Sequence, residues 1–499
     1  MSDDTGTDGE RAGADPDRGA SDASAGGRER LRAGLRRLVE ASAVERALIS
    51  LASLALAMLV GTALVLAAGR TTSCETAAFV LTHPTPFGLP RLFSMGFCFD
   101  PVTVYDRLFL GALGDPLSPG WDPLNPQMAV TLRGTTVLVF TGLSVALAFQ
   151  AGVFNIGTQG QMVVGGLATA LLTLWASPFV GGVVGTLLLV PLGLVVGAVF
   201  GGLYGAIPGA LKAYADANEV VTTIMLNFVA TGVALYLAGD VFKDTASQAN
   251  QTVPLPEYAR FPALVFGSGT GFSLAALALA VVGMVGLYYL LFRTAFGYDV
   301  RTSGLQPAAA RYGGVDAART VVASMTLSGA LGGLGGAVYV LMVVGKYQTG
   351  VPAYGFDGIT VAILAGNNPL GVSLAALLFG VLQSGTTVVQ FATDVPPELV
   401  GVLRGLIVLF VAMPEFFRLV GRRIVSPAPP AGGATVATDG GRAADDAGGR
   451  HADTDDPGVT RPDDAGAETR RAGDGRSSDA RATAGGHRAA DTDRGGERE

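Results

Sequence analysis

The stretch FVGGVVGTLLLVPLGLVVGAVFGGLYGAIP, residues 179–208, contains no charged residue. A helix that crosses the hydrocarbon core of a bilayer needs about 20 mostly apolar residues, because the core is about 30 Å thick and each residue advances the helix by about 1.5 Å. An open backbone finds no hydrogen-bond partner in lipid, so a run of this length has to be helical. Residues 179–208 are therefore predicted to form a membrane-spanning helix.

Eight further stretches carry the same signal, and they are 47–68, 128–150, 161–177, 218–241, 272–292, 320–343, 371–392 and 399–416. A shorter apolar piece, 358–366, cannot cross the bilayer straight and ends at Gly366-Asn367-Asn368-Pro369. This pattern is typical of a broken or half helix. The predicted fold is an all-α polytopic membrane protein with about ten transmembrane helices, including the half helix.

Two charged tails flank the apolar body. Hydrophobic residues make up 49% of the chain and charged residues 15%, whereas soluble domains carry about 25% charged residues. The predicted organisation is a disordered, basic cytoplasmic tail (1–46), a transmembrane domain (47–420) and a disordered, acidic and Arg-rich cytoplasmic tail (421–499). The net charge of −7 describes these tails and does not indicate a nucleic-acid partner.

The placement of basic residues predicts the orientation. They cluster before the first span, in the loop 293–319 and after the last span, and such clusters concentrate on the cytoplasmic side of a plasma-membrane protein. Both termini are therefore predicted to be cytoplasmic, with the loop 69–127 outside. Cys74 and Cys98 fall in this external loop, where a disulfide is chemically permitted. A bridge is favoured, and two free thiols remain the alternative.

Motifs for enzyme chemistry are missing from the sequence. A phosphate-binding P-loop needs a lysine followed by Ser or Thr, but Lys212, Lys243 and Lys346 are followed by Ala, Asp and Tyr. The chain is therefore not expected to be an ATPase or any other enzyme. It has no HExxH or GxSxG motif and no Cys/His cluster, so neither a metal site nor a bound cofactor is indicated.

Polar residues inside the apolar runs are the candidates for a solute pathway, because polar groups at membrane depth usually face the interior of the bundle. The segment 154–161 interrupts one apolar run. Its alternative explanation is a kink at a helix end whose backbone groups are hydrogen-bonded within the protein. Asn218 and Glu219 are better explained as a helix start. The pathway candidates are Asn155, Gln159, Gln161, Thr222, Asn227, Asp357, Asn367 and Asn368.

Structural explanations compete with function at other positions. Asp357 is well placed to be the N-cap of the short helix. Arg404 lies within the last span and is expected to pair with a carboxylate in the bundle or to extend toward the membrane surface. Rows of glycine spaced four apart, such as Gly197, Gly201 and Gly205, are best explained by close packing of helices.

Four strings of this sequence resemble the hallmark stretches of the nucleoside and simple-sugar ABC permeases, a family that includes ribose-type and branched-chain amino acid permeases. They are GVFNIGTQGQ (152–161), ANEVVTTIMLNF (217–228), YGFDGITVAILAGNNPLG (354–371) and RTAFGYDVRTSGLQPAAARYGGV (293–315). The resemblance covers about residues 130–415, and the Asn-Asn-Pro and Asn-Ile-Gly forms resemble the nucleoside branch more than the ribose branch. It implies the membrane-spanning subunit of an ATP-driven importer for nucleosides or simple sugars.

The resemblance also implies partners. These are ABC ATPase subunits that use the ATP, a second permease subunit in a related heteromer, an external substrate-binding lipoprotein, and the surrounding membrane lipid. The loop 293–316 is expected to contain the coupling helix that contacts the ATPase, with the residues Arg301, Gly304, Pro307, Ala308, Ala309 and Gly313. The alternative function is an ATPase-independent secondary transporter or channel for small polar solutes. Three aromatic residues that could stack on a nucleobase are better explained as core: Phe154, Phe228 and Phe356.

Overall fold

A computed structural model of the chain describes residues 43–82, 94–267 and 269–412. The chain divides into two units, Met1–Ala428 and Pro429–Glu499, and every described residue belongs to the first. The two predicted tails lie outside the described residues, apart from 43–46.

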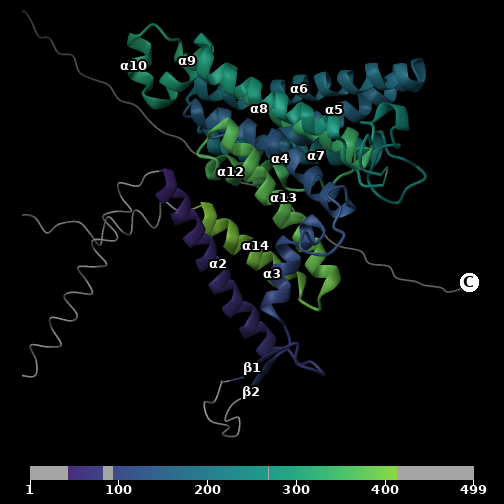
Figure 1. Cartoon of the computed structure of the whole chain (residues 1–499). Coiled ribbons are helices and arrows are strands. Elements are labelled where there is room, and N and C mark those ends of the chain that lie inside the picture. Colours follow the sequence, from purple (N-terminus) through teal and green to yellow (C-terminus); the bar gives the residue numbers. More distant parts are fainter. Residues whose placement is uncertain (1–42, 83–93, 268, 413–499) are drawn as a thin grey trace, which may run out of the picture. The chain divides into compact units, whose positions relative to one another are not determined.

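Each of the ten predicted apolar stretches contains a helix (Figure 1). Eight of these helices are long and apolar enough to cross a membrane, and α12 is a shorter apolar helix. The prediction of an all-α polytopic membrane protein is therefore confirmed. The ten helices are α2 (Ala43–Thr71), α4 (Pro126–Gln150), α5 (Thr158–Ala176), α6 (Gly182–Ala215), α7 (Glu219–Tyr236), α8 (Leu274–Arg293), α11 (Ala317–Val338), α12 (Tyr354–Leu364), α13 (Pro369–Ala392) and α14 (Pro397–Ala412).

Shorter elements lie in the connections between these helices. The strands β1 (Phe79–Thr82) and β2 (Ser94–Phe97) form an antiparallel hairpin, with Phe79 opposite Phe97. In Figure 1 this hairpin lies at the end of the bundle opposite to α9 and α10. The remaining elements are α3 (Pro101–Phe109), α9 (Ala295–Leu305), α10 (Pro307–Tyr312), η1 (Gly111–Leu113), η2 (Ser177–Phe179), η3 (Leu237–Val241), η4 (Glu257–Ala259) and η5 (Tyr339–Val344).

A glycine seam joins α6 to α11. A Cβ atom on Gly201 would lie 2.5 Å from the carbonyl oxygen of Gly329, and one on Gly333 would overlap the carbonyl oxygen of Gly197. The two backbones therefore touch directly, which only small residues allow. The interpretation of the spaced glycines as close helix packing is confirmed.

In the part of the chain that the structure describes, the buried hydrophobic residues form one large core and three smaller ones. Helix α4 lies in the middle of the large core, where every residue from Gly134 to Ala148 is buried, and it packs against α11, α12 and α13. A second core joins α2, α3, α13 and α14 around Leu108, Leu382 and Leu403. In Figure 1 the ribbons of α2 and α14 run side by side. The first and last described spans are therefore held together by an apolar contact of their own.

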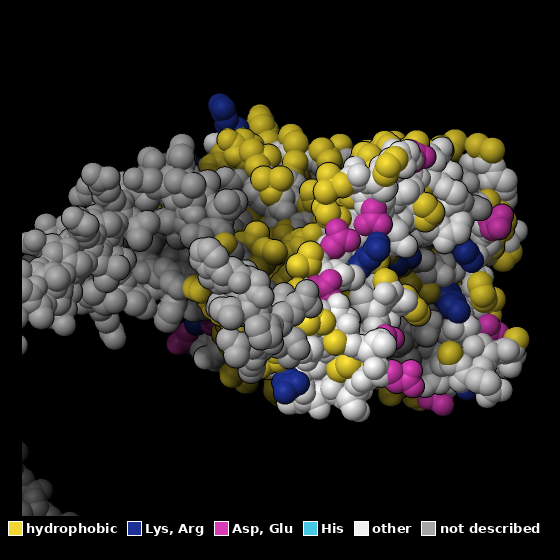
Figure 2. Space-filling view, turned by 60° about the horizontal axis from the view of Figure 1, so that its bottom comes forward, with side chains coloured by type: hydrophobic (Ala, Val, Ile, Leu, Met, Phe, Trp, Pro, Cys, Tyr) yellow, Lys and Arg dark blue, Asp and Glu magenta, His cyan; other side chains and the backbone are white. Residues whose placement is uncertain are grey.

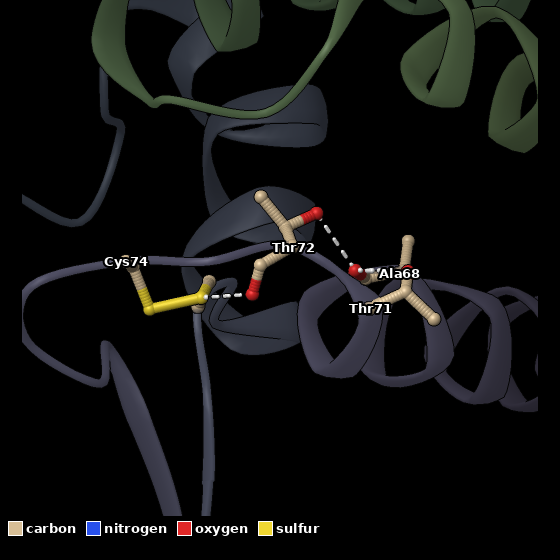
Figure 3. Close-up of a disulfide and its surroundings, with 5 residues drawn as sticks. Ala68, Thr71, Thr72 and Cys74 are labelled. Atoms are coloured by element: carbon tan, nitrogen blue, oxygen red, sulfur yellow. Dashed lines mark hydrogen bonds between the residues drawn. A yellow bond between two sulfur atoms is a disulfide. The ribbon is translucent and has the colours of Figure 1, made fainter.

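The segment that follows α2 is joined to the segment that follows β2 by a disulfide between Cys74 and Cys98 (Figure 3). The backbone N–H of Cys98 donates to the carbonyl oxygen of Gly69 at 3.0 Å. The hydroxyl of Thr72 donates to the carbonyl oxygen of Ala68 at 2.9 Å, which satisfies an acceptor in the last turn of α2. The hairpin is thereby fixed to the end of α2.

One predicted boundary is wrong by a full two turns. The sequence placed the end of the longest span at Pro208, but α6 continues to Ala215 with Pro191 and Pro208 inside it. Proline is tolerated within membrane helices because neighbouring helices satisfy or cover the freed carbonyl groups. The helix ends where Asp216 adopts a left-handed backbone with φ of 48°.

The hairpin end of the bundle has a mixed surface. Figure 2 brings this end forward and shows acidic and basic side chains interspersed on one half of it, with hydrophobic side chains along the upper edge and in a group near the middle of the view. In α3, Nη1 of Arg107 lies 2.9 Å from Oδ2 of Asp115, which forms an ion pair. The charged side chains of this end favour contact with water over contact with lipid.

Candidate functional site

The polar interruption between α4 and α5 is tied into the centre of the bundle. Nδ2 of Asn155 donates to Oε1 of Gln161 at 2.9 Å and lies 2.7 Å from Oγ of Ser328 in α11. Nε2 of Gln161 donates back to Oδ1 of Asn155 at 3.1 Å. Both amides are fully buried. The two candidates therefore satisfy each other, and non-helical backbone at this depth is tolerated because protein surrounds it.

Two serines that the sequence analysis did not single out complete this network. Oγ of Ser144 in α4 donates to the carbonyl oxygen of Ser328 at 2.7 Å, and Oγ of Ser328 donates to the carbonyl oxygen of Ser144 at 2.6 Å. Serine side chains commonly form hydrogen bonds between membrane helices. The only sequence signal was that each serine lies inside an apolar span.

The start of α5 is also where the polar segment 154–161 meets the start of α12. Oε1 of Gln159 accepts from the backbone N–H of Gly355 at 2.8 Å, and its Nε2 donates to the carbonyl oxygen of Pro352 at 3.1 Å. Oδ1 of Asn227 in α7 accepts from the N–H of Gly160 at 2.7 Å. The structure thus brings Asn155, Gln159, Gln161 and Asn227 together around one helix terminus.

Replacing Asn155 with leucine is expected to lower the free energy of unfolding by about 1–3 kcal/mol, because Gln161 and Ser328 would lose a buried partner. Thermal unfolding of the detergent-solubilised protein measures this effect. The control is Thr222→Val, since the hydroxyl of Thr222 bonds only to backbone carbonyls of its own helix start, and its cost should stay within about 0.5 kcal/mol. Equal losses in the two variants would contradict the network.

Asp357 is not the N-cap of α12, which corrects the expectation from sequence. The N-cap is Ala353, and Asp357 is the fourth residue of the helix. Oδ2 of Asp357 instead lies 2.8 Å from Nη2 of Arg404 in α14. The structure therefore supplies the partner of Arg404 that the sequence could not name, and this ion pair links α12 to α14.

The remaining pathway candidates lie apart from this cluster. Thr222 is in the first turn of α7, whose N-cap is Asn218; the expected helix start at Asn218 and Glu219 is confirmed. Asn367 has φ of 57° in the turn after α12, and its carbonyl oxygen accepts from Nε2 of Gln150 at 3.0 Å. Asn368 is the exposed N-cap of α13. Contact of any of the eight candidates with a solute stays a prediction.

The three aromatic candidates are not core residues. Phe154 is 52% exposed, Phe228 is 69% exposed and Phe356 is 43% exposed. The expectation of burial fails because each of them lies on a face of the chain that no described helix covers.

The loop between α8 and α11 folds into two short helices, α9 and α10. Gly304 packs against the end of α4, so that a Cβ there would overlap the carbonyl oxygen of Gln150 and lie 2.9 Å from the N of Gly152. Pro307 begins α10, and the N–H of Gly313 donates to the carbonyl oxygen of Ala309 at 3.1 Å, which ends it. Arg301 lies over the ring of Phe292 at 4.9 Å. Ala308 and Ala309 are exposed.

Two large side chains of this loop are largely exposed to solvent. The sequence analysis did not single them out. Leu305 is 88% exposed and Tyr312 is 96% exposed. A cavity of about 440 Å³ lies beside α10, lined in part by Lys212, Ser303 and Arg311. The loop is therefore both fixed to the bundle through Gly304 and open on its outer side.

Comparison with known proteins supplies the family. Residues 127–412 match the model of the branched-chain amino acid transport system permease component. The nucleoside ABC transporter permease NupB of Lactococcus lactis is 34% identical over 335 residues, which are 66% of this chain and 88% of that protein. The guanosine ABC transporter permease NupP of Bacillus subtilis is 35% identical over 58% of this chain and 82% of its own length.

A third relative is named for a different transported solute. The glucose ABC transporter permease TsgB13 of Haloferax volcanii is 31% identical over 64% of this chain and 82% of its own length. These relatives are named as permeases, so the chain is a transport subunit rather than an ATPase. The chain, with its apolar helices and its loop of α9 and α10, belongs to the branched-chain amino acid transport system permease family of ABC transporters.

Proposed function

We propose that this permease is the membrane-spanning subunit of an ATP-driven importer for nucleosides. One observation carries the proposal: Gly304 of the loop between α8 and α11 touches the chain at Gln150 and Gly152. Three residues further on, Asn155 enters the buried network with Ser328. A movement imposed on α9 and α10 from outside the membrane thus has a direct packed route to the centre of the bundle.

The partners of this importer follow from the family and from the loop surface. Permeases of this family work with ABC ATPase and further permease subunits. In our proposal the ATPase binds the side of α9 and α10 that exposes Leu305 and Tyr312, and ATP is used there rather than by this chain. A substrate-binding lipoprotein delivers the solute at the hairpin end. The protein sits in the plasma membrane with both termini in the cytoplasm, and a related second permease completes the pathway.

Nucleosides are favoured over simple sugars as cargo. The relatives named for nucleoside and guanosine transport are 34% and 35% identical to this chain, and the one named for glucose is 31% identical. A simple sugar is therefore the second candidate.

Uptake into proteoliposomes that contain the permeases, the ATPase and the binding protein tests the proposal. We expect labelled guanosine to accumulate only with ATP, and unlabelled guanosine to compete more strongly than glucose. Guanosine uptake that persists without ATP or without the ATPase would instead establish an ATPase-independent transporter. Glucose competing better than guanosine would assign the cargo to simple sugars.

A further inference from the structure

The ion pair between Asp357 and Arg404 lies well inside the membrane-spanning part. Arg404 is the eighth residue of α14, which places it about 10 Å along the helix from its start, at about 1.5 Å per residue. Asp357 is one turn into α12, whose beginning contacts Gln159 at the interior start of α5. The pair therefore lies close to the level at which the start of α12 meets the start of α5.

This ion pair is only partly buried. The side chain of Asp357 is 26% exposed and that of Arg404 is 25% exposed. Charged side chains at membrane depth face the bundle interior or a water-filled cavity, because exposure to hydrocarbon costs several kcal/mol. The exposed side of the pair is therefore more favourable when it faces water than when it faces hydrocarbon.

The chemistry of this exposed side defines the solute that fits it. The carboxylate offers hydrogen-bond acceptors and the guanidinium offers donors in a planar fork, while the two charges cancel and give no net attraction for an ion. Phe356, next to Asp357 in α12, is 43% exposed. Aromatic side chains stack on nucleobases irrespective of the base. The ion pair suits an uncharged solute with hydrogen-bonding groups, and the exposed ring of Phe356 suits a solute with a flat ring.

We propose that Asp357 and Arg404 line the translocation passage and hydrogen-bond to the base of a passing nucleoside, with Phe356 stacking on that base. This assignment rests on the proposed function and adds to it the residues that select a nucleoside over a sugar. A sugar has hydroxyl groups for the ion pair but no flat ring for Phe356. The two kinds of contact therefore predict different responses to substitution.

The test uses the complete transporter in proteoliposomes and compares guanosine with glucose as transported solutes. Arg404→Gln is expected to raise the KM for guanosine about tenfold. Arg107→Gln removes the exposed ion pair to Asp115 and is the control for the loss of an ion pair as such, because its unfolding temperature should stay close to that of the unmodified transporter. Phe356→Leu is expected to reduce guanosine uptake severalfold and to leave any residual glucose uptake unchanged, whereas Phe179→Leu, also at an exposed phenylalanine, should alter neither.

The charge-exchanged double variant Asp357→Arg with Arg404→Asp separates a solute contact from a structural link. We expect it to recover the thermal stability that either single substitution loses, while the KM for guanosine stays high. Recovery of both stability and KM would overturn the assignment and make the pair a structural link only. Equal loss of guanosine and glucose uptake in Phe356→Leu would also overturn it. Failure of the proposed function is seen separately, as ATP-independent uptake by the unmodified transporter.

Discussion

Replacing Gly333 with leucine is expected to prevent the accumulation of folded permease. A Cβ at this position would overlap the carbonyl oxygen of Gly197 and lie 2.8 Å from the Cα of Gly201. These are backbone atoms of α6 that cannot rotate away, so α6 and α11 would have to separate along their whole seam. We expect a loss of more than about 4 kcal/mol, the range of the most damaging single substitutions. Size-exclusion profiles and thermal unfolding of the solubilised protein measure it.

The matched control is Gly286→Leu in α8. Gly286 is exposed, and nothing lies within 4 Å of the position of its Cβ. A leucine there enters lipid and should leave both the elution profile and the unfolding temperature within the range of the unmodified chain. If the two variants behave alike, the seam does not hold α6 to α11 and the packing argument is wrong.

Replacing Gly304 with leucine is expected to abolish ATP-driven uptake while the permease still folds. The residue lies in α9, outside the main cores, and its contact is with the chain at Gln150, Ala151 and Gly152. A leucine side chain would lift α9 away from this contact and break the packed route into the bundle. We expect uptake to fall at least tenfold, which corresponds to about 1.4 kcal/mol of coupling free energy. Uptake, ATP hydrolysis and thermal unfolding are measured on the same preparation.

Gly286→Leu in α8, outside this loop, is the control for this variant. Nothing lies within 4 Å of the position of its Cβ. Uptake should therefore remain close to that of the unmodified chain. Uptake that survives in Gly304→Leu would show that the ATPase acts on the bundle through another contact.

Much of the fold could be predicted because its determinants are local. The ten helices were predicted from run length and absence of charge, and Asn218 was recognisable as a helix start from its own residue type and the acid beside it. The end of α6 was missed because the effect of Pro208 depends on the neighbouring helices that cover its turn. Local signals thus identified the elements but not all of their ends.

The candidate site was only partly predictable. Asn155 and Gln161 were recognised as polar groups at membrane depth, but their mutual hydrogen bonds were not. Asp357 was explained as an N-cap, because a sequence shows the residues next to it and not the guanidinium across the bundle. The exposure of Phe356 was also missed, since residue type alone favours burial for phenylalanine.

The sequence by itself determined that this chain is a polytopic membrane protein, because hydrocarbon thickness and backbone hydrogen bonding act on each apolar run separately. The loop 293–316 was expected from the resemblance to a permease family. Only the tertiary structure decided which polar groups pair. Asn155 meets Ser328 across 173 residues of sequence, and Asp357 meets Arg404 across 47. Such pairs form because helix packing brings distant turns to the same depth, where a polar group without a partner is costly.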